Sequence, residues 1–140
     1  MTYTGRCACT KVTLAITGDA IGVRQCWCRQ CQQIAAGGPT HNVMFKAEDV
    51  TLSGTLGTHA YLAPSGHMLT QYFCPSCGAA VGSQSAARMH FMNIRLGMFD
   101  VPHDLKPRAV IWTSEAPAWA MLDPALEHFE RQPPPPVPKD

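Results

Sequence analysis

Residues 73–79 read FCPSCGA, with Cys74 and Cys77 in a C-x-x-C pair, a proline inside the turn and Gly78 directly after it. Such a turn lets two thiolates share one metal ion at about 2.3 Å, and glycine tolerates the backbone angle that closes the turn. A thioredoxin-like redox pair would instead open a helix within a βαβ pattern, which the sequence lacks. The stretch therefore predicts half of a structural zinc site.

The N-terminus supplies the other half. Cys7 and Cys9 flank a single residue and precede an alternating apolar stretch that begins at Val12. Side chains at positions i and i+2 of an extended chain project to the same face, so both sulfurs can reach one ion. With Cys74 and Cys77 they complete the four-thiolate tetrahedron of a closed zinc site, which would tie the N-terminal strand to the middle of the fold.

The remaining three cysteines lie in one hexapeptide, CWCRQC, at residues 26–31. Cys26, Cys28 and Cys31 leave no fourth cysteine, because the chain has seven in all. Three protein ligands with an open fourth position are typical of catalytic zinc. Since three thiolates outweigh the charge of the ion, we expect the site to acidify water weakly and to suit a thiol better. A bound thiol would be held as its thiolate, ready to add to a carbonyl or to release one.

The alternative for these three cysteines is a second structural zinc whose fourth ligand is a distant histidine or carboxylate. The chain has six histidines, and no two of them form the H-x(3–5)-H pair of zinc fingers. His41 is the first candidate, because it follows the glycines just after the hexapeptide.

Residues beside the hexapeptide are candidates for ligand contacts. The side chains of Arg29 and Gln30 could reach a molecule at the open position. Gly37 and Gly38 would let backbone amides approach an anion, or would simply end a helix over residues 29–36.

Short alternating apolar segments, separated by Gly, Pro, Ser and Asp, predict a mainly β fold with one or two short helices. We expect one domain over residues 1–131, with Trp112 and Trp119 in its core and short helical turns over 114–130. Residues 132–140 form a proline-rich tail that we expect to be disordered and solvated. The clearest strand segments are 12–16, 43–45, 50–52, 69–73 and 91–96.

Composition argues against several classes of partner. Charged residues make up 15% of the chain and the net charge is +1, so no strong field would attract nucleic acid or an anionic membrane. No basic leader precedes an apolar core, and no run approaches the roughly 18 apolar residues of a membrane span. We expect a cytoplasmic protein with reduced thiols. The sequence does not indicate an oligomeric state.

Five stretches, in this order and at similar intervals, resemble the glutathione-dependent formaldehyde-activating (GFA) family, which includes the centromere-protein-V type proteins. The resemblance implies an Mss4-like fold around a structural zinc and a second zinc at Cys26, Cys28 and Cys31. It also implies a carbon–sulfur lyase that joins glutathione and formaldehyde into S-hydroxymethylglutathione. The stretches are GRCACTKV (5–12), CWCRQCQQIAAGG (26–38), YFCPSCGAAV (72–81), IRLGMFD (94–100) and PRAVIWTSEAPAW (107–119).

The chain departs from this family pattern at two positions. Thr10 stands where the family often has glycine, and we expect it to alter a turn. Trp27 stands where the family often has histidine, so it adds apolar surface beside the open position and removes a proton carrier. Arg95 and Asp100 resemble a family turn, and we expect them to be structural, with Asp100 accepting backbone amides.

The leading hypothesis is a zinc-dependent carbon–sulfur lyase acting on adducts of glutathione, or another small thiol, with an aldehyde. The alternative is a non-catalytic binding module in which both zinc ions are structural. A methionine sulfoxide reductase would need a reactive cysteine outside its zinc sites, and the two predicted sites use all seven.

Overall fold

The structure is a computed structural model that describes residues 1–134. Strands dominate it and α1 is a single short helix, which confirms the predicted mainly β class. The elements are β1 (Thr2–Arg6), β2 (Thr13–Thr17), β3 (Gly22–Cys26), α1 (Arg29–Ile34), β4 (Thr40–Lys46), β5 (Val50–Ser53), β6 (Gly57–Leu62), β7 (Met68–Phe73), β8 (Ala80–Ser85), β9 (Phe91–Arg95), β10 (Ala109–Ile111) and β11 (Glu127–His128), with 3-10 turns at Ala47–Asp49, Leu96–Met98 and Thr113–Glu115.

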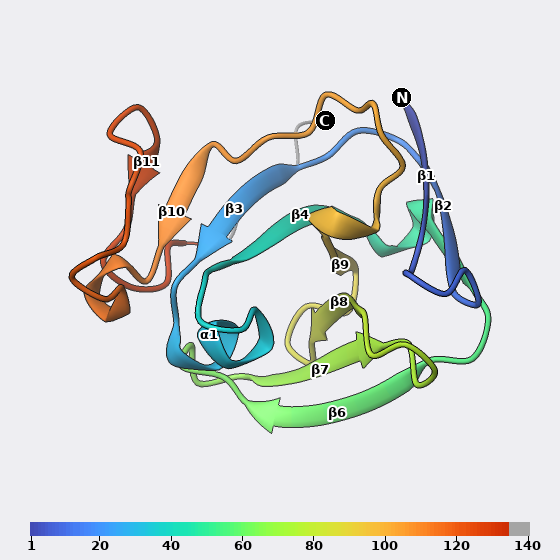
Figure 1. Ribbon diagram of the computed structural model, residues 1–140, viewed down its shortest axis with the longest axis horizontal. Coiled ribbons are helices and arrows are strands. Elements are labelled where there is room, and N and C mark those ends of the chain that lie inside the picture. Colours follow the sequence, from blue (N-terminus) through green and yellow to red (C-terminus); the bar gives the residue numbers. More distant parts are fainter. Residues whose placement is uncertain (135–140) are drawn as a thin grey trace.

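The strands form two sheets. The small sheet is antiparallel, in the order β1-β2-β5, and the large sheet has the order β11-β10-β3-β4-β9-β8-β7-β6. In the large sheet β10 runs parallel to both β3 and β11, whereas the other pairs are antiparallel. Figure 1 shows the large sheet curling from β3 and β4 through β9 and β8 to β7 and β6, with α1 at one end of the curl.

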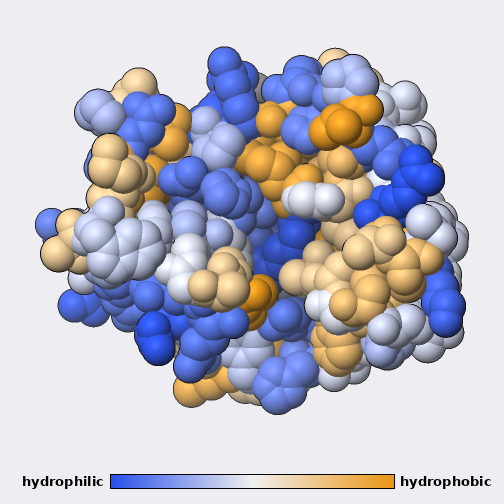
Figure 2. Space-filling model, viewed as in Figure 1, coloured by the Kyte–Doolittle hydropathy of each residue, from blue (hydrophilic) through white to orange (hydrophobic). Residues whose placement is uncertain are grey.

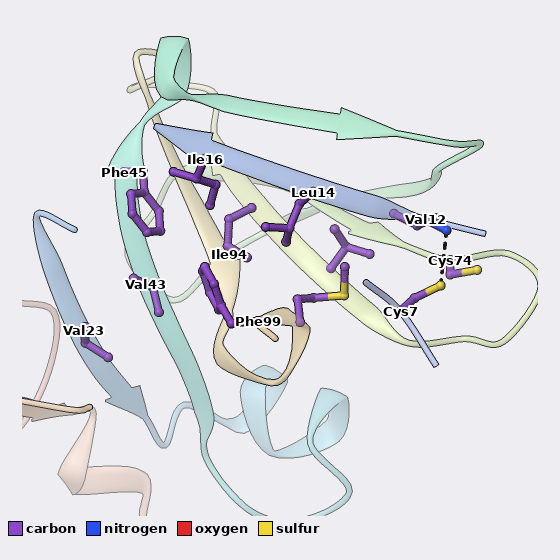
Figure 3. Packing of buried hydrophobic residues seen from close by; sticks show 12 residues of the cluster. Cys7, Val12, Leu14, Ile16, Val23, Val43, Phe45, Cys74, Ile94 and Phe99 are labelled. Atoms are coloured by element: carbon purple, nitrogen blue, oxygen red, sulfur yellow. Dashed lines mark hydrogen bonds between the residues drawn. The ribbon is translucent and has the colours of Figure 1, made fainter. Parts of the chain in front are cut away.

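The apolar core lies between the small sheet and one face of the large sheet. Strand β2 alternates strictly, with Leu14 and Ile16 buried and its other three residues exposed. Figure 3 shows these two side chains in one cluster with Phe45 and Ile94, which belong to β4 and β9 of the large sheet. Burial of an aliphatic side chain of this size contributes about 1.5–3 kcal/mol, so the alternation fixes which face of β2 turns inward.

The register of the large sheet separates its two faces. Val23 pairs with Val43, which pairs with Ile94, and all three belong to the core. The next row joins Arg24 to Asn42 and Asn42 to Arg95. Because side chains alternate along a strand, this second row points to the opposite, concave face.

The C-terminal part differs from the sequence prediction. Residues 114–130 form part of a 3-10 turn and the strand β11, not a run of helical turns. Pro117 and Pro124 remove amide donors there, and β11 pairs with β10 instead. Trp112 is buried as predicted, but the prediction that Trp119 lies in the core is wrong, because its side chain is 69% exposed.

The predicted tail begins with residues that contact the domain. The indole Nε1 of Trp112 donates to Oε1 of Gln132 at 3.1 Å, and Pro133 is buried. The prediction of disorder for 135–140 lies outside the described residues. No helix within residues 1–134 has the length and apolar character that a membrane crossing needs.

Asp100 also differs from the sequence prediction. Its carboxylate accepts from the Thr4 hydroxyl at 2.8 Å and from Nε of Arg6 at 3.2 Å, so its partners are side chains and not backbone amides. These contacts tie β1 to the segment after β9. Hydrogen bonds from Thr4 and Arg6 hold the pKa of Asp100 below its usual value.

The close approach of β1 to the Leu96–Met98 turn gives a testable prediction. A Cβ atom on Gly5 would lie 2.1 Å from the carbonyl oxygen of Met98, which is backbone and cannot rotate away. We expect Gly5→Ala to lower the free energy of unfolding by about 3 kcal/mol. Gly97→Ala is the control, because nothing lies within 4 Å of its added Cβ. Denaturant unfolding of both variants measures the difference, and equal midpoints would contradict the packing described.

Candidate functional site

Four cysteines converge where the two sheets meet. Cys7 and Cys9 lie in the turn between β1 and β2, and Cys74 and Cys77 lie in the turn between β7 and β8. Their sulfur atoms are all within 4.8 Å of one another, with Cys9 Sγ at 3.6 Å from the sulfurs of both Cys7 and Cys74. Metal–sulfur bonds of about 2.3 Å in a tetrahedron place sulfurs about 3.8 Å apart. The four thiols therefore fit one tetrahedral metal ion.

Local backbone geometry holds each pair in place. The amide of Val12 donates to Cys7 Sγ at 3.3 Å, which Figure 3 shows as a dashed line. Thr10 closes the first turn with a φ of 70°, a left-handed angle that is uncommon for a β-branched residue. Gly78 closes the second turn with a φ of 76°. Hydrogen bonds from the backbone amides of Ala79 and Cys9 lower the pKa of Cys77 to about 6, which favours the thiolate that a metal binds.

The other three cysteines form a separate cluster. Cys26 ends β3, Cys28 is the N-cap of α1, and Cys31 lies in the first turn of that helix. Cys28 Sγ accepts the amide of Cys31 at 3.3 Å, and the three sulfurs lie within 4.8 Å of one another. All three side chains are buried. We call Cys26, Cys28 and Cys31 the thiol trio.

The thiols of the trio compete for ionisation. Hydrogen bonds from Cys26 and Cys28, with smaller effects of Thr40 and the charge of Arg95, lower the pKa of Cys31 to about 3. Hydrogen bonds to Cys28 and Cys31 raise the pKa of Cys26 far above its usual value. A bound cation removes this competition, because each thiolate can then face positive charge. The donor set therefore also fits a metal ion.

Within residues 1–134, no histidine or carboxylate joins the trio as a fourth ligand. The candidate His41 lies in β4 directly after Thr40, which pairs across the sheet with Cys26 of the trio. Neighbours on a strand face opposite sides, so His41 points away, and its Nε2 lies 3.1 Å from Nε2 of its cross-strand partner Gln25.

The trio opens into a cavity of about 120 Å³ on the concave face of the large sheet. No aspartate or glutamate is among the described residues that line it. The space-filling view in Figure 2 shows a hollow near the centre of this face with hydrophilic side chains at its bottom. Besides the trio, the polar and aromatic lining residues are Arg24, Asn42, Tyr61, Ser65, Ser83, Ser85, Arg88, Asn93, Arg95, Trp112 and Gln132.

Three arginines make this cavity cationic. Arg24 comes from β3, Arg95 from β9, and Arg88 from the turn between β8 and β9. Arg95 is only 7% exposed; its Nη1 donates to Oδ1 of Asn42, while its buried Nε has no hydrogen-bond partner in the described part of the chain. Burial and the like charge of Arg88 lower the pKa of Arg24. Arg95, which the sequence suggested to be structural, thus lies beside the candidate reaction site.

Tyr61 of β6 faces the trio across the cavity. Its ring is half-buried, and burial together with the charges of Cys31 and the other trio thiols raises the pKa of its hydroxyl. The hydroxyl therefore keeps its proton at neutral pH and can donate a hydrogen bond. Tyr61 cannot be recognised as a site residue from the sequence alone, because nothing in its local sequence distinguishes it from other strand residues.

The side chains predicted to contact a ligand lie elsewhere. Trp27 is buried outside the cavity and packs edge-to-face against Trp119, with ring centroids 6.1 Å apart. Arg29 is exposed, and its Nη1 donates a hydrogen bond to Oε1 of Gln32. The side chain of Gln30 donates to the carbonyl of Leu62 at 3.1 Å, which attaches α1 to the end of β6. None of the three lines the cavity.

Gly37 and Gly38 are also outside the cavity, and their amides are already used. Gly37 donates to the carbonyl of Gln32 at 2.7 Å, and Gly38 donates to the carbonyl of Ala35. Ala36 adopts a left-handed φ of 57°, so this segment closes the end of α1 as in a Schellman motif. The two glycines therefore end a helix, and their amides are not free to bind an anion.

Comparison with known proteins identifies the family. The profile described as "Glutathione-dependent formaldehyde-activating enzyme" matches residues 2–115. The chain belongs to this GFA family. Its mainly β architecture is the Mss4-like fold expected of a GFA domain.

A solved structure of a Rhodobacter sphaeroides protein, a structural genomics target, has a similar fold. It superposes with a TM-score of 0.55 and 15% sequence identity, over 71% of this chain and 90% of the other. No curated protein matches the GFA-family chain.

The two cysteine clusters of this GFA-family protein give different predictions. In Cys28→Ser the new hydroxyl still caps α1, so we expect the fold to persist while the trio loses its metal. In Cys74→Ser the closed site at the sheet junction is lost, and we expect the domain to unfold.

Elemental analysis and circular dichroism measure these outcomes. The wild-type chain should hold two metal ions for its two clusters, and Cys28→Ser should hold one. A Cys28→Ser protein that retains both ions would contradict the assignment of the trio as a metal site.

Proposed function

We propose that this protein is a zinc-dependent carbon–sulfur lyase that forms and cleaves adducts of an aldehyde with a small thiol such as glutathione. Support comes from membership of the GFA family and from three buried thiols without a fourth ligand within residues 1–134. The observation that carries the proposal is that this incomplete thiol set opens into a cavity. A purely structural site would be closed by the chain itself.

The two clusters would hold two zinc ions. Cys7, Cys9, Cys74 and Cys77 form the closed set expected of a structural ion. Cys26, Cys28 and Cys31 would hold the second ion, whose charge supplies the means of keeping an incoming thiol as its thiolate. All seven cysteines are free thiols, which fits the reducing cytoplasm that we propose as the setting.

The reaction needs no oxidant. In the direction of synthesis a sulfur–carbon bond forms, the carbonyl π bond breaks, and the thiol proton ends on the aldehyde oxygen. Cleavage reverses these changes. The developing charge on that oxygen must be met by a hydrogen-bond donor.

Tyr61 is the residue that we assign to this role. It lines the cavity, and its raised pKa keeps the hydroxyl protonated. The walls formed by Ile111 and Trp112 are buried and apolar, so they limit the water that competes for this hydrogen bond.

The proposal is tested by exchange at equilibrium, because aldehydes and thiols also combine without an enzyme. Magnetisation transfer between ¹³C-formaldehyde and its glutathione adduct should be accelerated by the zinc-loaded wild-type protein. Cys28→Ser, which we expect to remain folded, should leave the exchange at the uncatalysed rate. If the wild-type protein accelerates no aldehyde–thiol exchange, the non-catalytic binding module becomes the better hypothesis.

A second variant isolates the hydrogen-bond donor. We expect Tyr61→Phe to lower kcat by about tenfold to a hundredfold with little change in KM, because the lost contact acts on charge that develops in the transition state. Tyr72→Phe is the control, since Tyr72 bonds Gln84 and does not line the cavity. Steady-state kinetics of both variants would separate them, and equal activities would exclude the role of Tyr61.

A further inference from the structure

We propose that the cavity selects a small mercapto acid, and that Arg95, with Arg24 and Arg88, binds its carboxylate. The inference rests on the proposed function, since it names the class of thiol that the same site would accept. It assigns recognition of the carboxylate to arginines that line the cavity. The residues beside the thiol trio, such as Arg29 and Gln30, would take no part in it.

The first support is a charge imbalance. The described residues that line the cavity include three arginines and no acid, and none of these arginines forms an ion pair within residues 1–134. A divalent ion held by three thiolates has a formal charge of −1, so one guanidinium balances it. The carboxylate of Glu127, which does not line the cavity, acts on Arg24, so at least one guanidinium charge remains for a ligand, because arginine does not lose its proton.

The second support is the buried guanidinium itself. Arg95 is 7% exposed, yet among residues 1–134 its Nε has no hydrogen-bond partner and its only side-chain hydrogen bond is to Asn42. A buried charged donor without a partner is costly, and a carboxylate on the cavity side would satisfy it. Guanidinium binds a planar carboxylate through two parallel hydrogen bonds, which ammonium cannot do.

The position of Arg95 sets how far the carboxylate lies from the sulfur. Asn42, which accepts from Arg95, donates to the hydroxyl of Thr40 at 3.0 Å, and Thr40 pairs across the sheet with Cys26 of the trio. The guanidinium thus lies two side chains away from a metal ligand. A cavity of about 120 Å³ is close to the size that encloses benzene, so it encloses about six non-hydrogen atoms, and a larger thiol such as glutathione would extend beyond it. A mercapto acid with a three-carbon chain has this size.

The test measures binding, so it does not depend on turnover. The protein is loaded with cobalt, and the ligand-field spectrum is titrated with 3-mercaptopropionate and with its methyl ester, which has the same thiol but no charge. We expect the wild-type protein to bind the acid about tenfold more tightly than the ester, or better. Cys28→Ser identifies the spectral change that belongs to the trio.

Arginine variants assign the preference to the cavity. We expect Arg95→Met to remove the difference between acid and ester while leaving the ester affinity unchanged. Arg88→Met, which replaces a less buried residue, should reduce the same difference even if Arg95→Met fails to fold. Arg108→Met is the matched control, because Arg108 is exposed and does not line the cavity.

The outcomes separate the two proposals. Equal affinities for acid and ester in the wild-type protein would overturn the mercapto acid inference and leave the proposed function standing. A preference that survives in both Arg95→Met and Arg88→Met would also overturn it. If neither thiol changes the cobalt spectrum, the proposed function fails together with the inference.

Discussion

The thiols of Cys7, Cys9, Cys74 and Cys77 lie together where the small sheet meets the large sheet, and the position of the two sheets depends on this cluster. Cys7 and Cys74 are buried within the same apolar cluster as Val12, although 67 positions separate the two cysteines (74 − 7). Ionised thiols at 3.6 Å repel one another, so a cation bound between them would stabilise the cluster. A metal ion held by the two cysteine turns would fasten the small sheet to the large one beside the hydrophobic core.

The second cluster depends on that framework. The thiol trio begins at the last residue of β3 and continues into α1, which Gln30 attaches to β6 at the other side of the curled sheet. Arg24 and Cys26 are two residues apart on β3, and the trio and the three arginines line the same cavity. Residues held on strands keep their separation better than residues on loops, which suits a site that must match both a sulfur and a charge.

The spacing of the cysteines in the sequence predicted the two thiol clusters. It did not predict the arginine-lined cavity, whose residues are far apart in the sequence. C-x-C and C-x-x-C pairs determine their own geometry, so the grouping of four and three cysteines could be read from the chain. Arg24 and Arg95 come together through the register of β3, β4 and β9, and Arg88 joins them from the turn between β8 and β9; no local pattern specifies this arrangement. Trp119 was placed in the core because it is large and apolar, but the prolines around it prevent the helix that would have buried it.

The pairing of alternate residues in β3, β4 and β9 has a consequence for how such proteins diversify. Val43 and Ile94 pack in the apolar core, whereas their immediate neighbours Asn42 and Arg95 line the cavity and are not part of that core. Related proteins can therefore replace the cavity-lining side chains and bind new ligands, while the core side chains keep the same fold. Common architecture at 15% identity, as with the Rhodobacter sphaeroides protein, is the expected outcome of such an arrangement.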